Sequence, residues 1–273
     1  MTQRFRRVTS VPGLSRRHLA LLFCAGSILV ACPQKSQTEE ISHLKRKETK
    51  ELVTPPPLLP QPAPSQALPT PLSKRRYVVA ALGDSLTDAR SGGGYLQVLR
   101  KECPESVFLN FGKGGDMTNQ MRRRWENDIR PQIGTHNITT LLVFGGVNDL
   151  YSDLTASRIN EKIEADLTSI FTSAHSASLE VVAITVSPWG GFKKYWNERR
   201  GENTQLLNSW LLAQVTSKHV DKVVDSYSLL SCGDHNMLCP EYETRFHDGI
   251  HFGKIGHTLL GKRLAEQAFA DCL

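Results

Sequence analysis

The chain has 273 residues and a formal net charge of +6, a value that by itself points to a polyanionic partner such as nucleic acid. The charge is unevenly distributed, because five arginines in residues 1–31 and a surplus of four cations in residues 32–76 leave −3 for residues 77–273. A slightly acidic domain has no general attraction for phosphate backbones, so nucleic-acid binding is excluded. The length beyond residue 76 suits one ordinary domain with a sizeable core.

Residues 1–31 have the pattern of a signal peptide. The five arginines, with no acid among them, come before an apolar run from Leu19 to Val30. These 12 residues would span about 18 Å as a helix, well short of the ~30 Å hydrocarbon core, which favours a signal peptide over a transmembrane helix. The paired arginines in residues 15–19 are similar to a twin-arginine export signal, and both this route and the general secretory route stay open.

The apolar run ends in Leu29-Val30-Ala31-Cys32, which resembles the lipobox of bacterial lipoproteins. The resemblance predicts cleavage before Cys32 and lipidation of Cys32, and Cys24 would be removed with the leader. Lipid chains would hold the protein to a membrane of the bacterial cell envelope, on its periplasmic or surface side. Ordinary signal cleavage nearby, with Cys32 as an incidental thiol, is the alternative.

Residues 32–76 have the composition of a flexible tether. The first part is charged and polar, and residues 52–72 contain eight prolines. Proline fixes φ and donates no backbone hydrogen bond, so this stretch is predicted to be extended and semi-rigid. A spacer that holds a domain away from the membrane is the simpler interpretation, and a Pro-rich docking ligand is the alternative.

From residue 77 onward, short apolar runs alternate with segments of helical periodicity. The predicted strands are residues 77–82, 107–111, 140–144, 179–186 and 220–224, and the predicted helices include residues 156–174, 205–216 and 255–270. This alternation predicts one α/β domain over residues 77–273, with a single doubly wound, flavodoxin-like parallel sheet and helices on both faces. In such a sheet, functional residues lie in loops beyond the carboxyl ends of the strands.

Four motifs occupy such loops. They are Gly83-Asp84-Ser85-Leu86, the segment NFGKGGD over residues 110–116, Gly146-Val147-Asn148-Asp149 and Asp248-Gly249-Ile250-His251. In this order the motifs resemble the four blocks of the GDSL, or SGNH, hydrolase family over residues 77–273. The resemblance implies an SGNH-type fold and a serine esterase without metal or organic cofactor. It implies that Ser85 is the nucleophile, that Asp248 and His251 complete a triad, and that Ser85, Gly115 and Asn148 form the oxyanion hole.

The chemistry of these residue types fits those roles. A serine hydroxyl becomes a good nucleophile when a neighbouring base accepts its proton, and histidine titrates near neutral pH. An aspartate fixes the imidazole tautomer, and amide donors stabilise the oxyanion. Each residue alone has a structural alternative, since Ser85 could cap a helix and Asp248 and Asn148 could be turn residues. His257 is expected at the start of the last helix rather than in a metal site.

Four cysteines remain in the predicted domain. Cys232 and Cys239 flank a polar loop, and export implies an oxidising compartment, so a disulfide between them is predicted over free thiols. Cys103 ends the first helix and Cys272 the last. Helices at these positions often share one face of the sheet, so a second disulfide is a candidate there, and two free thiols are an equal alternative.

Two aromatic residues, Trp189 and Phe192, follow the fourth predicted strand. They could line an acyl pocket or stack on a sugar, and packing of the loop against the domain is an equal alternative.

Together these features predict an exported, lipid-anchored serine esterase that hydrolyses carboxylic esters such as acyl esters or lysophospholipids. An O-acetyl esterase acting on envelope carbohydrate is the first alternative, since the tether could reach ~100 Å when largely extended. A non-catalytic lipoprotein that binds envelope polymer is the alternative from another class. The predicted partners are an ester substrate and the anchoring membrane.

Overall fold

The computed structural model describes residues 74–88, 90, 94–152 and 159–273. The predicted signal peptide, Cys32 and residues 32–73 of the predicted tether lie outside the described residues. No helix within the described ranges combines the length and hydropathy that a membrane crossing requires.

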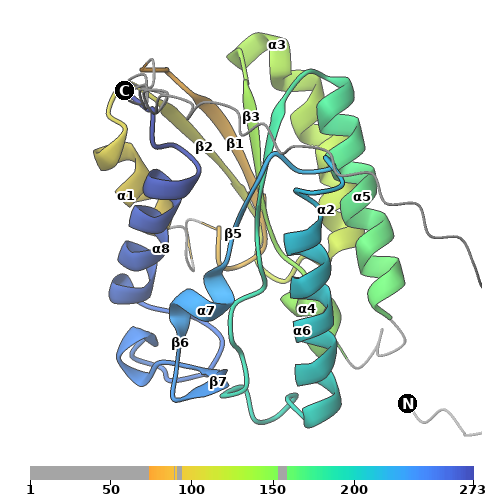
Figure 1. Cartoon of the computed structure of the whole chain (residues 1–273), viewed down its shortest axis with the longest axis vertical. Coiled ribbons are helices and arrows are strands. Elements are labelled where there is room, and N and C mark those ends of the chain that lie inside the picture. Colours follow the sequence, from red (N-terminus) through yellow and green to blue (C-terminus); the bar gives the residue numbers. More distant parts are fainter. Residues whose placement is uncertain (1–73, 89, 91–93, 153–158) are drawn as a thin grey trace, which may run out of the picture. The chain divides into compact units, whose positions relative to one another are not determined.

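Five parallel strands form the central sheet in the order β2-β1-β3-β4-β5 (Figure 1). They are β1 (Val78–Gly83), β2 (Val107–Gly112), β3 (Thr140–Phe144), β4 (Glu180–Ile184) and β5 (Lys222–Val224). Each strand lies within two residues of its prediction at both ends. The strand order is that of a flavodoxin-like sheet, which confirms the predicted fold class.

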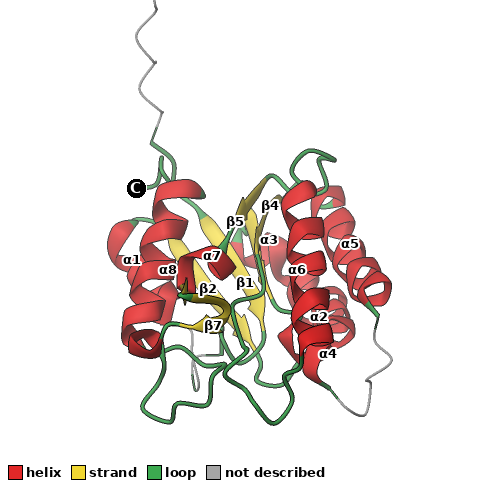
Figure 2. Cartoon of the chain, turned by 60° about the horizontal axis from the view of Figure 1, so that its bottom comes forward, coloured by secondary structure: helices red, strands yellow, loops and turns green. Residues whose placement is uncertain are grey.

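Helices cover both faces of this sheet, as Figure 2 shows. One face carries α1 (Gly94–Glu102), α7 (Ser226–Leu230) and α8 (Lys254–Gln267), and the other carries α2 (Thr118–Arg124), α3 (Ile133–His136), α4 (Val147–Tyr151), α5 (Asn160–Ser176) and α6 (Glu198–Ala213). Side chains alternate between the two layers along each strand. In β1, Val79 and Ala81 pack beneath α1 and α8, and Ala80 and Leu82 pack on the opposite face. Burial on both faces explains why the strands are apolar throughout.

The helices agree less closely with their predictions. Helix α6 begins seven residues earlier than predicted, because the Asn197 side chain caps it by accepting a hydrogen bond from the Arg200 N–H (3.0 Å). The sequence pattern predicts no helix between Thr118 and His136, yet this segment forms α2, a π-helical turn (η1, Trp125–Ile129), a 3₁₀ turn (η2, Arg130–Gln132) and α3. A further 3₁₀ turn, η3, spans Pro240–Tyr242.

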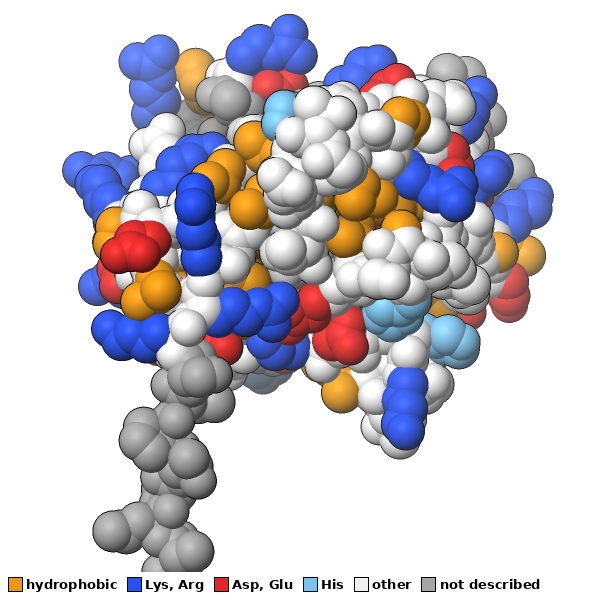
Figure 3. All heavy atoms as spheres, turned by 90° about the horizontal axis from the view of Figure 1, so that it is seen from above, with side chains coloured by type: hydrophobic (Ala, Val, Ile, Leu, Met, Phe, Trp, Pro, Cys, Tyr) orange, Lys and Arg blue, Asp and Glu red, His pale blue; other side chains and the backbone are white. Residues whose placement is uncertain are grey.

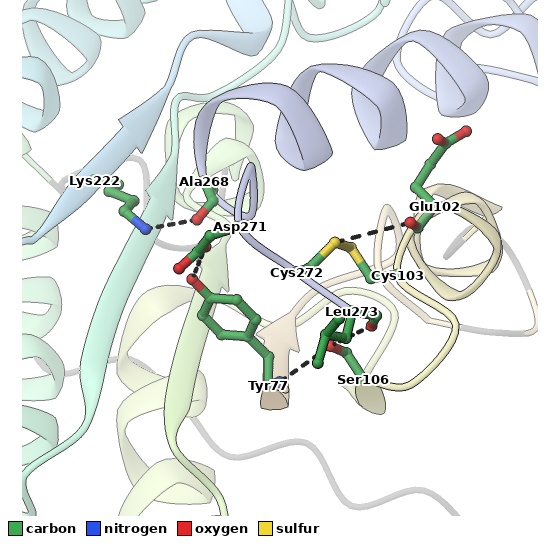
Figure 4. Close-up of a disulfide and its surroundings, with 9 residues drawn as sticks. All are labelled: Tyr77, Glu102, Cys103, Ser106, Lys222, Ala268, Asp271, Cys272 and Leu273. Atoms are coloured by element: carbon green, nitrogen blue, oxygen red, sulfur yellow. Dashed lines mark hydrogen bonds between the residues drawn. A yellow bond between two sulfur atoms is a disulfide. The ribbon is translucent and has the colours of Figure 1, made fainter. Parts of the chain in front are cut away.

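The two ends of the described domain are joined at the side where the strands begin. The backbone of Arg75 pairs with that of Cys272, through hydrogen bonds from Arg75 N–H to the Asp271 carbonyl (2.7 Å) and from Leu273 N–H to the Arg75 carbonyl (3.0 Å). A disulfide between Cys103 and Cys272 lies beside this pairing, with Cα atoms 5.4 Å apart (Figure 4). Helices α1 and α8 share a sheet face as predicted, although Cys272 lies five residues beyond the end of α8.

Figure 3 shows the end of the domain where the strands begin, with Lys and Arg side chains around a small exposed apolar area. A cavity of about 310 Å³ lies at this end, and its lining residues are Arg76, Val78, Val107, Leu109, His136, Asn137 and Thr139. Because the predicted functional residues follow the carboxyl ends of the strands, this cavity lies at the opposite end of the sheet from them.

Candidate active site

Ser85 lies in a tight turn directly after β1. The Asp84 carbonyl accepts hydrogen bonds from the N–H groups of Thr87 (3.2 Å) and Asp88 (2.9 Å), and the Asp84 side chain accepts one from the Leu86 N–H (2.9 Å). These bonds fold residues 84–88 back on themselves. Asp84 is fully buried by this turn, whereas Ser85 is half-buried and directed towards His251.

The structure brings together three of the predicted site residues. The Ser85 Oγ lies 2.8 Å from the His251 Nε2, and the His251 Nδ1 lies 2.7 Å from the Asp248 Oδ2. Ser85 comes from the loop after β1, and the other two residues come from the loop before α8. A carboxylate that accepts from Nδ1 leaves Nε2 as the acceptor for the serine hydroxyl. This geometry is capable of removing the hydroxyl proton.

The backbone of the same loop holds the Asp248 carboxylate in place. Its Oδ1 accepts hydrogen bonds from the N–H groups of Ile250 (3.0 Å) and His251 (2.8 Å). Burial tends to raise the pKa of Asp248, but these hydrogen bonds and the one from the His251 ring outweigh it, so the pKa is lowered. Asp248 is therefore ionised at neutral pH and available to bind the imidazole.

A close approach of two glycines fixes the position of this loop. Gly249 has a φ of +75°, and a Cβ on it would lie 2.0 Å from the backbone carbon of Gly191, in the loop after β4. The loop after β4 is in turn held by the hairpin of β6 (Ser231–Cys232) and β7 (Asp234–Leu238), since the Gly190 N–H donates to the Asn236 carbonyl (2.7 Å). The Cys232–Cys239 disulfide closes this hairpin.

Gly115 and Asn148, the two predicted oxyanion-hole residues besides Ser85, lie in neighbouring loops. Gly115 is exposed and has a φ of +81°, and Asn148 is buried in α4. The Asn148 Nδ2 donates to the carbonyl of Asp116 (2.9 Å) and to the Oδ2 of Asp84 (3.3 Å). The Asn148 amide therefore links the loop of Ser85 to the loop of Gly115.

The orientation of the Asn148 amide is set by Tyr151, whose hydroxyl donates to the Asn148 Oδ1 (2.7 Å). Tyr151 belongs to a half-buried aromatic cluster with Phe192 and Tyr195, with ring centroids 5.0–5.4 Å apart. This cluster lies beside the predicted oxyanion residue. Because its rings are half-buried, a bound molecule could contact this cluster next to Asn148.

Trp189 and Phe192, predicted together as pocket residues, have different surroundings. Trp189 is 1% exposed, and its indole N–H donates to the Thr204 hydroxyl of α6 (2.9 Å). Trp189 therefore packs in the core, since it is buried and its indole N–H has a partner inside the domain. For this residue the structure favours loop packing over a role in a substrate pocket. Phe192 is only half-buried and remains available for contact with a substrate.

Three buried carboxyl groups near the site were not singled out in the sequence. Burial raises the pKa of Asp84 to about 7, and the neighbouring Asp149 and Asp116 act in the same direction against the hydrogen bond from Leu86. Asp149 accepts hydrogen bonds from the N–H and hydroxyl of Thr118 (both 2.9 Å). Asp84, Asp116 and Asp149 each lie within one of the four motifs, and this position is the feature of the sequence that could have identified them as site residues.

The described residues contain no group of three or more His, Cys, Asp or Glu side chains arranged to hold a metal ion. His257 lies in the first turn of α8, as predicted, and its ring packs on Phe252 (4.4 Å between centroids) and Tyr95 (6.2 Å). Its surroundings are aromatic rather than those of a ligand set.

Comparison with known proteins adds a family match and a set of similar folds. A sequence profile described as the GDSL-like Lipase/Acylhydrolase family matches residues 81–259, a range that contains all four motifs. No curated protein sequence matches the chain.

Several solved structures share the fold. A GDSL-like lipase from Bacteroides thetaiotaomicron has a TM-score of 0.58 at 17% identity, over 69% of this chain and 86% of that one. A lipase/acylhydrolase from Enterococcus faecalis has a TM-score of 0.55 at 18% identity, over 70% and 94%. A psychrotrophic esterase from Pseudoalteromonas sp., inhibited by monoethylphosphonate, has a TM-score of 0.51 at 14% identity, over 71% and 97%.

Proposed function

This chain belongs to the GDSL-like lipase/acylhydrolase family and is an ester-hydrolysing enzyme, and we propose that it cleaves carboxylic esters through a triad of Ser85, His251 and Asp248. One observation carries the assignment. The Ser85 Oγ, the His251 ring and the Asp248 carboxylate are connected by hydrogen bonds of 2.8 and 2.7 Å. An uninterrupted connection of this kind is what a serine needs in order to lose its proton as it attacks.

The proposed reaction has two halves. In the first, the Ser85 Oγ attacks the ester carbonyl carbon while the His251 Nε2 takes the hydroxyl proton and then passes it to the departing alcohol oxygen. The acyl group is now bonded to Ser85. In the second half, a water attacks the acyl carbon, His251 takes its proton, and Ser85 leaves with that proton as the carboxylic acid is released. Asp248 stabilises the imidazolium in both halves.

The tetrahedral intermediate needs hydrogen-bond donors around its oxyanion. We assign this role to the backbone N–H groups of Ser85 and Gly115 and to the Nδ2 of Asn148. The contact of 3.3 Å between Asn148 and Asp84 is the longer of the two that Nδ2 makes, and the oxyanion would replace it. Loss of one such donor typically costs about 3–4 kcal/mol of transition-state stabilisation.

The test combines a fluorophosphonate probe with hydrolysis of p-nitrophenyl acetate. Wild-type protein is expected to be labelled at Ser85 and to hydrolyse the ester, and the Ser85→Ala variant is expected to do neither. Ser176→Ala, at the exposed end of α5, is the matched control and should behave as wild type. Labelling that survives in Ser85→Ala would contradict the assignment, and absence of labelling in the wild type would favour the non-catalytic, polymer-binding alternative.

A second candidate is an O-acetyl esterase that acts on envelope carbohydrate. A cavity of about 350 Å³ is lined by Trp196, Glu198, Glu202, Gln205 and Asn236. Trp196 directly follows Tyr195 of the aromatic cluster in the sequence. A half-buried aromatic ring with amide and carboxylate side chains suits a sugar, whose ring has apolar faces and hydroxyl edges. Asn236 also belongs to the hairpin that supports the loop after β4.

Parallel assays distinguish the two candidates. The substrates are p-nitrophenyl acetate, a lysophospholipid and an acetylated wall polysaccharide. If the polymer is the substrate, Trp196→Ala should lower kcat/KM for the polysaccharide and leave p-nitrophenyl acetate unchanged. An equal effect on all three substrates would exclude a dedicated sugar-binding role for the cavity.

We further propose that the enzyme is an exported lipoprotein of the bacterial cell envelope. The proposal depends on the lipobox-like sequence at Cys32, which lies outside the described residues. Cys32→Ser is expected to move the protein from the membrane fraction to the soluble fraction and to abolish incorporation of a labelled fatty acid. Fatty-acid labelling that persists in this variant would contradict the assignment of Cys32.

A further inference from the structure

Arg124, at the end of α2, makes three hydrogen bonds through one largely buried guanidinium group. Its side chain is 16% exposed. The Nε donates to the Asp116 carboxylate (2.5 Å), the Nη1 to the Phe111 carbonyl (2.7 Å) and the Nη2 to the Gly83 carbonyl (2.9 Å). These acceptors come from the ends of β1 and β2 and from the loop that follows β2.

The three acceptors belong to the segments that carry the proposed oxyanion donors. Gly83 lies two residues before Ser85, and Asp116 directly follows Gly115. The Asp116 carbonyl also accepts the hydrogen bond from the Asn148 Nδ2 (2.9 Å). One guanidinium is therefore connected to the segment of Ser85, to that of Gly115 and, through Asp116, to the side chain of Asn148.

The neighbouring arginines of α2 differ from Arg124 in both partner and exposure. Arg122 pairs with Asp166 of α5 and is 41% exposed, and Arg123 is exposed. Of these three arginines, Arg124 is the one whose described hydrogen bonds reach the loops of the site. Its planar group with five N–H donors matches acceptors in several directions at once, which the single ammonium of a lysine does not.

We propose that Arg124 is a positioning residue that fixes the geometry of the oxyanion hole. It acts through Gly83 and Asp116 and does not touch the substrate. The proposal rests on the proposed serine-esterase function, because the Ser85 N–H, the Gly115 N–H and the Asn148 Nδ2 need a fixed arrangement only if they bind an oxyanion together. Positioned donors act mainly on the transition state, where the negative charge develops.

The first test is kinetic. Arg124→Lys keeps the charge and loses the three-way hydrogen bonding, and it is expected to lower kcat for p-nitrophenyl acetate by about 10- to 100-fold with KM changed less than about threefold. The matched control is Arg122→Lys on the same helix, which should retain the wild-type kcat. Thermal unfolding of both variants reports whether the fold is retained.

The second test separates positioning from general stability. A trifluoromethyl ketone forms a tetrahedral adduct with serine and places an oxyanion in the hole, so its Ki should rise by the same factor by which kcat falls. The affinity for the corresponding unreactive methyl ketone should not change. Should Arg124→Lys fail to fold, Asp116→Asn, which keeps the side-chain size, is expected to lower kcat by about three- to tenfold in the same manner.

Two results would overturn the inference and leave the esterase assignment intact. One is a wild-type kcat in Arg124→Lys, and the other is a lowered kcat with an unchanged Ki for the trifluoromethyl ketone. Ser85→Ala is measured in parallel. Hydrolysis by the wild type that does not depend on Ser85 would overturn the proposed function itself, and the role of Arg124 with it.

Discussion

Asp248 and His251 are three residues apart, so one loop supplies both the imidazole and the carboxylate that binds it. The backbone N–H groups that also bind Asp248 hold its pKa low, although burial opposes them. A group whose pKa is lower in the folded state adds stability above its unfolded pKa, and this contribution is lost as the pH falls through the folded value. Asp248 therefore supports both the tautomer of His251 and the fold of the loop at neutral pH.

The first prediction concerns this carboxylate. Asp248→Asn replaces an acceptor with an amide that can donate to the His251 Nδ1, and this favours the tautomer whose Nε2 cannot accept the Ser85 proton. We expect kcat to fall on the order of 10³- to 10⁴-fold, with a small change in melting temperature. Steady-state kinetics and thermal unfolding are the measurements. A loss smaller than about tenfold would mean that Asp248 does not control the tautomer.

The second prediction concerns His257, whose burial against Phe252 and Tyr95 lowers its pKa to about 4. The nearby His251 acts in the same direction. An unfolded histidine titrates near 6.5, so between these values the unfolded chain binds a proton that the folded chain does not. Stability must therefore fall as the pH falls through this window.

Between pH 7 and pH 4.5 this effect amounts to about 2 kcal/mol. Urea unfolding at both pH values measures how far the unfolding free energy falls between them. This fall should be about 2 kcal/mol smaller in His257→Gln than in the wild type. His235→Gln, at an exposed position of β7, is the control and should lose as much as the wild type. Equal pH sensitivity in wild type and His257→Gln would contradict the prediction.

For single residues, membership of a sequence motif predicts the surroundings of a side chain better than its position after a strand does. Ser85, Asp248 and His251 could be predicted to lie together because each belongs to a recognisable motif, and Ser85 also follows the carboxyl end of a strand. Trp189 has the same kind of position, but its surroundings depend on Thr204, fifteen residues later in α6. Arg124 is one of three consecutive arginines, and the sequence does not distinguish it from its neighbours.

At the scale of elements, the strands could be predicted and part of the helical layer could not. Continuous apolar runs are sufficient for strands that are buried on both faces. The segment formed by α2, η1 and η2 has buried residues at 121, 125 and 129, a spacing of four that a regular helix would support. It is rich in charge and contains Pro131, and the chain passes through π and 3₁₀ turns instead.

The third prediction compares the two disulfides. The Cys103–Cys272 bond closes 169 residues and the Cys232–Cys239 bond only 7. The chain-entropy estimate gives about 5 kcal/mol for the long loop and about 2 kcal/mol for the short one. Urea unfolding of the two Cys→Ser double variants should show this order.

Activity should show the reverse order. The short disulfide closes the hairpin that holds the loop of Gly190 and Gly191 against Gly249, whereas the long one lies at the other end of the sheet. Loss of the short bond should therefore lower kcat more than loss of the long one. Matching kinetics in the two double variants would mean that the hairpin does not support the loop of His251.

The fourth prediction concerns the contact between Gly249 and Gly191. Gly249→Ala introduces a Cβ at a φ of +75° and within 2.0 Å of the Gly191 backbone, so both strain and steric overlap result. We expect a loss of about 3 kcal/mol in unfolding free energy, and lower activity. Gly233→Ala has a similar φ of +69° with open space around it, and should cost about 1 kcal/mol. Equal losses would show that the two loops can separate freely.

At the scale of the whole molecule, the proposed triad lies at one end of the sheet and the first described residues lie at the other. Ser85 follows β1, and Arg75 comes before it, so the length of β1 separates them by about 20 Å. The proposed tether therefore joins the domain at the end of the sheet remote from the triad. A boundary near residue 76 is a prediction from the abrupt change of composition there, whereas the side of attachment depends on strand direction.

The pairing of Arg75 with Cys272 brings the beginning and the end of the described chain into contact. A linker of a few residues from Leu273 to Lys74 would therefore make a ring, which can be reopened at the exposed turn of Ser217 and Lys218 to give a circular permutant. This permutant is the fifth prediction. Circular dichroism and Ser85-dependent hydrolysis should match those of the wild type, because the order in which the elements are synthesised does not enter the geometry of the triad.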